Sequence, residues 1–169
     1  MAATYEPIES VTLTSDVAGV TFDAIAPDWT DLVLVITGES TRTDSSRGGG
    51  IRVGSGSLDE GSNYSVTTLQ GNGSAATSYR TPNYDRLLGL EFGRYGYGDV
   101  VNIAHFMSYA STNNYKTVLM SSANANNLVL RTVGLWRSSS AITHIQVLVG
   151  LNELAAGTTL SLFGIKAAP

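Results

Sequence analysis

The chain has 169 residues, of which 43% are hydrophobic and only 14% are charged, with 18 glycines and no cysteine. This charged fraction lies well below the roughly 25% of ordinary soluble domains, and such Gly-rich compositions are typical of β-rich proteins that pack against partners. The net charge of −4 argues against nucleic acid as a partner, and the lack of cysteine excludes disulfides and Cys-based zinc sites. The length predicts a single domain over residues 1–169.

The N-terminal sequence and the apolar runs give no membrane or export signal. The first ten residues, MAATYEPIES, lack a basic region followed by an apolar run, so we expect no signal peptide. No apolar stretch approaches the roughly 18 residues that a membrane span requires. We therefore expect a protein that has no membrane partner.

The first half of the chain predicts short strands separated by long loops. Leu32–Ile36 is apolar on both faces, which indicates a strand buried on both sides, or one that packs against a partner on one side. Glu39–Gly50, with its triple glycine, is expected to be a surface loop. Gly71–Asp85 is expected to be irregular because Pro82 argues against a strand. The other predicted strands here are Ser10–Asp16, Val20–Phe22, Ile51–Val53, Asn63–Leu69 and Leu87–Phe92.

The second half alternates apolar and polar residues more regularly. Leu128–Trp136 and Thr143–Val149 each alternate at period two, and the Ser138–Ser140 joint between them predicts a hairpin. Trp136 shares a face with Leu130, so we expect it to lie in the core or between subunits. The connector Asn152–Ala156 could form one helical turn. The remaining predicted strands are Val100–Tyr109, Tyr115–Ser121 and Thr158–Ile165.

About ten short strands and no amphipathic helix predict an all-β fold, either a sandwich or a barrel. The connections are tight in the second half and long in the first, which favours a jelly-roll-like, antiparallel two-sheet sandwich over a meander barrel.

No catalytic or metal-binding pattern emerges from the sequence. His105 and His144 lie in predicted strands without a neighbouring acid on the same face, whereas a metal site needs three or four ligands. Nearly all acidic residues lie in or beside turns, and neither Asp28/Asp31 nor Asp59/Glu60 matches a calcium loop. We therefore expect no enzyme activity, no metal and no cofactor.

One region is enriched in Tyr and Arg, the residue types that often contact partner proteins. Tyr and Arg dominate many interfaces, and aromatic rings also stack on sugars. Three roles remain open for this region: contact with a partner protein, binding of carbohydrate, and simple covering of the end of the sandwich. The candidate contact residues are Tyr79, Tyr84, Arg86, Arg94, Tyr95 and Tyr97, with Arg80 beside them.

The order and spacing of several short segments resemble small structural proteins of tailed bacteriophages, particularly those of cyanobacterial hosts. The resemblance covers most of the chain, although no single segment is specific. Where such proteins often have an Asn-Gly-Asp type turn, this chain has Gly54-Ser55-Gly56, which departs from the pattern. The segments are DLVLV at Asp31, IRV at Ile51, SNYS at Ser62, YKTV at Tyr115, GLWRS at Gly134, AIT at Ala141, AGT at Ala156 and LFGI at Leu162.

The resemblance implies a virion component with a jelly-roll-like fold and no catalytic residues. Its expected role is a capsid decoration, or cement, protein that forms a homo-oligomer, a trimer, and stabilises the head by contacting the major capsid protein. The alternative is a tail-fibre or receptor-binding module that recognises host glycans. The small size and the absence of a coiled-coil or shaft repeat favour the cement role.

Overall fold

We describe a computed structural model of the chain, which defines residues 5–43, 47–93, 95–96, 100–124 and 128–166. The described part is built from strands, and it contains no helix long and apolar enough to cross a membrane. The strands are β1 (Tyr5–Thr12), β2 (Gly19–Phe22), β3 (Asp31–Gly38), β4 (Arg47–Gly54), β5 (Tyr64–Gly71), β6 (Ala76–Tyr84), β7 (Leu87–Phe92), β8 (Val100–Phe106), β9 (Lys116–Asn124), β10 (Leu128–Trp136), β11 (His144–Val149) and β12 (Thr159–Ile165).

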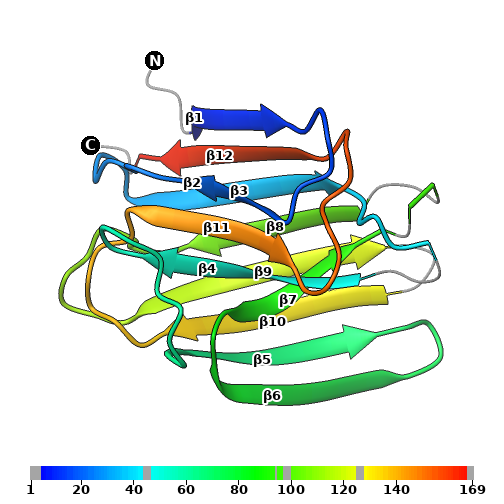
Figure 1. The fold of residues 1–169 in the computed structure, drawn as a ribbon. Helices are drawn as coiled ribbons and strands as arrows, with labels where there is room; N and C mark the ends of the chain where they lie inside the picture. Colours follow the sequence, from blue (N-terminus) through cyan, green and yellow to red (C-terminus); the bar gives the residue numbers. More distant parts are fainter. Residues whose placement is uncertain (1–4, 44–46, 94, 97–99, 125–127, 167–169) are drawn as a thin grey trace.

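The strands form two antiparallel sheets of unequal size. The larger sheet has eight strands in the order β1-β12-β3-β8-β9-β10-β5-β6, and the smaller has four in the order β2-β11-β4-β7. The smaller sheet lies across one face of the larger, while β5 and β6 extend beyond it (Figure 1). This arrangement confirms the predicted all-β, antiparallel two-sheet sandwich of jelly-roll type.

The core lies between the two sheets and follows from the alternation along each strand. Leu32, Leu34 and Ile36 of β3 are fully buried, and the inner residues of β11, among them Ile145 and Val147, face them from the smaller sheet. Burial of one aliphatic side chain contributes about 1.5–3 kcal/mol, so these facing rows supply much of the stability of the sandwich.

The predicted alternation of Leu128–Trp136 is confirmed, but the predicted hairpin is wrong. β10 pairs with β9 and β5 in the larger sheet, whereas β11 pairs with β2 and β4 in the smaller one. The connection that contains Ser138–Ser140 therefore crosses from one sheet to the other. Alternation reports which face of a strand is buried, and both sheets bury one face against the same core, so the pattern alone could not separate them.

The expected loop at Glu39–Gly50 is also wrong at its end, because the triple glycine lies within β4. β4 is held between β11 and β7, and its glycines admit neighbouring side chains. A side chain at Gly49 would overlap the ring of Phe92, and one at Gly50 would lie 2.8 Å from Cδ of Arg86. The absence of side chains here is thus a packing requirement rather than a sign of a loop.

Three further expectations are corrected. Gly71–Asp85 contains the regular strand β6, and Pro82 is tolerated because β6 is an edge strand with a register shift near its end. The first strand begins at Tyr5 rather than Ser10. No helix forms at residues 152–156, where Leu154 instead bridges to Val17 and Ser40.

Trp136 lies in the core, as predicted, and it also ties a loop to the larger sheet. Its side chain is 3% exposed, and Nε1 donates a hydrogen bond of 2.7 Å to Oδ2 of Asp59. Asp59 also accepts hydrogen bonds from the side chain of Asn63 and the backbone N–H of Gly61. Burial works to raise the pKa of Asp59, but these hydrogen bonds outweigh it and hold the pKa below its ordinary value.

We expect Trp136→Ala to lower the free energy of unfolding by about 3–5 kcal/mol, because it removes a buried indole. Trp136→Phe keeps most of the apolar contact but removes the donor to Asp59, so its cost should depend on pH. Because the folded-state pKa of Asp59 is depressed, its contribution is present above about pH 4 and is lost as the pH falls through the folded pKa. Urea denaturation at pH 7 and pH 2.5 measures both effects; equal costs for Trp136→Phe at the two pH values would contradict this assignment.

Candidate functional site

The outer face of the eight-stranded sheet, which points away from the core, carries an unusual number of exposed aliphatic side chains. They come from four adjacent strands, β8, β9, β10 and β5. We call this set the outer-face patch. It consists of Leu69 (63% exposed), Val101 (44%), Ile103 (42%), Leu119 (42%), Val129 (50%) and Val133 (52%).

The strand register arranges the patch in rows across the sheet, and in the middle row Ser121 and Arg131 lie between Ile103 and Leu69. One row across the sheet runs from Leu119 on β9 to Val133 on β10, which are directly paired. A second row places Val101 and Val129 on either side of Ala123. Directly opposite residues on a sheet lie about 4.5–5.5 Å apart, so the aliphatic side chains of these rows lie side by side. Isolated exposed apolar residues are normal on protein surfaces, whereas here six of them lie on four adjacent strands.

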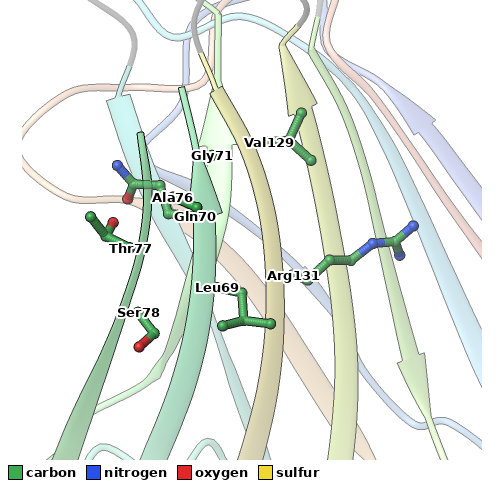
Figure 2. Close-up of a pocket in the computed structure, with 8 residues that line it drawn as sticks. All are labelled: Leu69, Gln70, Gly71, Ala76, Thr77, Ser78, Val129 and Arg131. Atoms are coloured by element: carbon green, nitrogen blue, oxygen red, sulfur yellow. The ribbon is translucent and has the colours of Figure 1, made fainter. Parts of the chain in front are cut away.

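Two shallow pockets occupy the patch. One, of about 640 Å³, lies among Ile103, Leu119 and Val133 and reaches Met120 and Thr132 at its floor. The other, of about 460 Å³, is formed by β5, β6 and β10, and its lining residues are shown in Figure 2. Leu69 and Arg131 line both pockets, so the two form one groove across the face.

Polar side chains make up half of the lining of the larger pocket, namely Thr67, His105, Ser121, Arg131 and Thr132. Arg131 is exposed and makes no ion pair with any residue that the structure describes; its side chain extends away from Leu69 (Figure 2). His105 is directly opposite Leu119 on the neighbouring strand, and its Nε2 lies 3.0 Å from Oδ2 of Asp31. The surface is therefore mixed: exposed aliphatic side chains lie beside hydroxyl groups, an arginine and an Asp–His pair.

The Asp31–His105 contact was not expected from the sequence, because Asp31 belongs to a different strand. Oδ1 of Asp31 also accepts a hydrogen bond of 2.7 Å from the backbone N–H of Ser108. An Asp–His pair that activates a nucleophile needs a hydroxyl or thiol at the second imidazole nitrogen. Among the described residues, Nδ1 of His105 has no hydrogen-bond partner, so here the pair orients the ring and links β3 to the β8 terminus.

The structure brings together part of the Tyr/Arg set that the sequence singled out. Tyr84 and Arg86 line a pocket of about 270 Å³ beside Gly48 and Gly49. Tyr79 lines an adjoining pocket of about 200 Å³ that shares the same two glycines. The guanidinium carbon of Arg86 lies 5.8 Å from the centre of the Tyr84 ring. These pockets open beside β4 and β7 and are separate from the outer-face patch.

The other members of that set are not part of this cluster. Tyr95 lies in the β7–β8 connection, where its backbone N–H donates to the carbonyl of Arg42. Arg80 lies on β6, opposite Thr67. The predicted contact residues Arg94 and Tyr97 lie outside the described residues.

The charges around the Tyr84 pocket are paired. Asp85 accepts hydrogen bonds from both Arg86 and Arg52, and Arg52 also contacts Glu60. Burial works to raise the pKa of Asp85, but the hydrogen bonds and positive charges of these arginines outweigh it and hold the pKa below its ordinary value. Two cations thus face two carboxylates. Across the described part of the chain, no group of three or more His, Asp or Glu side chains could hold a metal ion.

Comparisons with known proteins add little to the assignment. No protein-family model and no curated protein matches the sequence. Similar solved structures include the galectin LEC-6 of Caenorhabditis elegans, with 8% identity, a TM-score of 0.36 and coverage of 94% of this chain and 96% of that one. The homodimeric agglutinin CG-16 from chicken liver has 14% identity, a TM-score of 0.34 and coverage of 85% and 98%. Alginate lyase Aly36B has 7% identity, a TM-score of 0.36 and coverage of 92% and 77%. At these values we draw no conclusion about ligand or activity.

One sign of the outer-face patch in the sequence was the apolar character of both faces of Leu32–Ile36. In the structure, Val33 and Val35 lie on the outer face, in the same rows as His105 and Ile103, although Val33 itself is buried. The same signal was present in β10, where Val129 and Val133 occupy the face opposite to the core. An aliphatic residue on the second face of an otherwise amphipathic strand was the sign of the patch.

We expect the patch to contribute little to folding, in contrast to the inner face of the same strand. Met120→Ala should lower the free energy of unfolding by about 2–5 kcal/mol, because Met120 is 2% exposed. Leu119→Ala, one residue away on the outer face, should cost less than about 1 kcal/mol. Urea denaturation followed by circular dichroism measures both, and similar costs would mean that Leu119 is covered within the monomer.

Proposed function

We propose that this chain is a non-catalytic structural protein that binds, through its outer-face patch, to the protein lattice of a larger particle. The observation that carries the proposal is the group of exposed aliphatic side chains formed by Leu69, Leu119 and their neighbours on four adjacent strands. Apolar surfaces of this kind mark sites of association because water contact with them is unfavourable.

The chemistry of the patch favours protein over sugar as its partner. A sugar ring presents hydroxyl groups, and covering hydroxyl groups with aliphatic side chains leaves hydrogen bonds unmade. The larger pocket is bounded by Ile103, Leu119 and Val133, and no Phe, Tyr or Trp ring lines it; its one aromatic ring is the imidazole of His105, which is held by Asp31. Aliphatic side chains of a partner protein can cover the aliphatic part of this surface without leaving hydrogen bonds unmade.

The size of the patch favours a lattice over a single free partner. Complete burial of an aliphatic side chain contributes about 1.5–3 kcal/mol, so six side chains that are about half exposed would contribute roughly 4.5–9 kcal/mol. Association itself costs about 4–15 kcal/mol. One copy therefore binds weakly, whereas several linked copies on a repeating surface gain from their effective concentration.

The sequence resemblance to phage structural proteins gives the proposal a concrete form. In that form the particle is a virion, the lattice is the major capsid protein, and the chain acts as a decoration protein that stabilises the head. Because the contact is apolar, it should be tolerant of moderate salt, which screens charges but leaves apolar burial intact.

A second candidate function is supported by the pocket beside Tyr84. Its volume of about 270 Å³ and its aromatic and guanidinium groups suit one sugar unit of a host glycan. Because the charges of Arg86 and Arg52 are paired with Asp85, this pocket would take a neutral sugar rather than an acidic one. This function corresponds to a receptor-binding module on a tail.

The test uses head particles that lack the protein, mixed with the purified chain or a variant. Val133→Asp places a carboxylate within the patch and should weaken particle binding at least tenfold, because docking would remove water from the charged group. Leu151→Asp is the matched control, since Leu151 is 90% exposed and lies outside the patch. Binding is measured by co-sedimentation over a range of salt, and bound protein should raise the melting temperature of the particles.

The alternative is tested in parallel with a glycan panel. Glycan binding that is lost in Tyr84→Ala, with no uptake by particles, would replace the proposed function with the second candidate. Equal binding of the Val133→Asp and Leu151→Asp variants to particles would also contradict the proposed role of the patch.

A further inference from the structure

The two edges of the eight-stranded sheet differ in how they are protected. Unpaired strand edges attract other strands, and proteins usually block them with charges, prolines or bulges. The edge strand β1 has all three devices, with Glu6, Pro7 and Glu9 and a register shift between Pro7 and Glu9. The opposite edge, β6, lies free at the bottom of Figure 1.

The strand β6 has a long unprotected stretch. Eight of its nine residues are exposed, although Tyr79 and Tyr84 line pockets together with Gly48 and Gly49 of β4. Its pairing with β5 is regular from Ala76 to Thr81, and the register shift and Pro82 come only after that stretch. Arg80 is the charged residue within it. Ala76–Thr81 is therefore a flat, extended edge that can accept another strand.

The backbone groups that face outward from β6 can be assigned. The backbone N–H of Asn72 donates to the carbonyl of Ala75, so these two form a hydrogen-bonded pair at the β5–β6 turn. Hydrogen-bonded pairs alternate along an antiparallel ladder. Thr77, Tyr79 and Thr81 therefore direct their backbone groups to β5, and Ala76, Ser78 and Arg80 direct theirs to the free edge.

We propose that a second copy of this chain pairs with β6 in antiparallel fashion, across a two-fold axis centred on Ser78. In this register Ser78 lies opposite Ser78 of the other copy, and Ala76 lies opposite Arg80. All three outward-facing residues then form hydrogen-bonded pairs, each of which exchanges two backbone bonds. The result is one continuous sheet that spans both copies.

This register is favoured over those shifted toward Pro82 for two reasons. Centring the axis on Tyr79 would place Ala76 opposite Pro82, which has no N–H to donate. Centring it on Arg80 would place two like charges directly opposite each other, which is destabilising. A second copy is a suitable occupant because the two edges are identical, and isologous pairing leaves no unpaired stretch to propagate.

The pairing would also affect docking through the outer-face patch, and only this consequence rests on the proposed function. A two-fold axis perpendicular to the sheet keeps both outer-face patches on the same side of the dimer. Leu69 is opposite Ser78 on the adjacent strand, so each patch begins close to the axis. The dimer would thus present two patches to one surface, as bivalent docking requires.

The direct test is cross-linking, for which the absence of cysteine from the chain is an advantage. In the proposed register Ser78 lies about 5.5 Å, Cα to Cα, from its counterpart, a distance that a disulfide spans. Ser78→Cys should form covalent dimers under mild oxidation at least ten times faster than Thr77→Cys or Glu9→Cys. Equal rates for the three variants would overturn the proposal.

A second test uses proline at positions that differ only in the direction of the N–H. Ser78→Pro removes an outward-facing donor, so it should keep the fold and raise the dimer dissociation constant at least tenfold. Thr77→Pro removes a bond to β5 and should lower the melting temperature. Analytical ultracentrifugation and thermal denaturation measure these effects. A dimer or trimer that Ser78→Pro leaves intact would show that the copies associate elsewhere.

The β6 pairing and the docking role of the outer-face patch can be disproved independently. Val133→Asp should leave the β6 dimer unchanged while it abolishes particle binding. If Ser78→Pro dissociates the dimer and Val133→Asp has no effect on particles, the pairing stands and the docking role of the patch falls.

Discussion

The structure depends on burying the inner faces of two sheets of unequal size against each other. The smaller sheet has four strands and the larger has eight, so the smaller one cannot cover the whole of the larger. Inner residues such as Leu34 and Val147 meet in the middle, and they supply the apolar burial that offsets the entropy of ordering the chain. The tie between Trp136 and Asp59 fixes the loop after β4 to this core.

Because the two sheets differ in size, the chain has surfaces that it does not use for its own folding. β6 lies beyond the smaller sheet, and eight of its nine residues are exposed. On the outer face of the larger sheet, Leu69, Leu119 and Val133 are aliphatic and exposed. These residues are about half buried in the monomer and contribute little to its folding. Under the proposed function, a partner protein would cover them.

The sequence predicted the class of fold because alternation directly reports the burial of one strand face. It identified β3, β7 and β10 within a few residues. It failed where tertiary packing overrides local preference: the glycines of β4 make room for Phe92 and Arg86, and Pro82 is accepted at an edge. It also joined β10 and β11 in a hairpin, since alternation contains no information about which sheet a strand enters.

The candidate site was predicted less well, because its residues come together only through strand pairing. The Tyr84 and Arg86 neighbourhood was found from composition, and their role in contacting a partner remains a prediction. The Asp31–His105 pair joins residues that are 74 positions apart, and the outer-face patch draws on four strands. No local motif marks such a surface, although the second apolar face of β3 and of β10 pointed to it.

The most direct test of the account is hydroxyl-radical footprinting of the protein, free and bound to head particles. The account predicts strong protection of Leu69, Leu119 and Val133 on binding, while the exposed Leu151 remains labelled to the same extent in both states. Unchanged labelling of the three patch residues, with protection of Tyr84 instead, would contradict the claim that the outer face of the eight-stranded sheet is the docking surface.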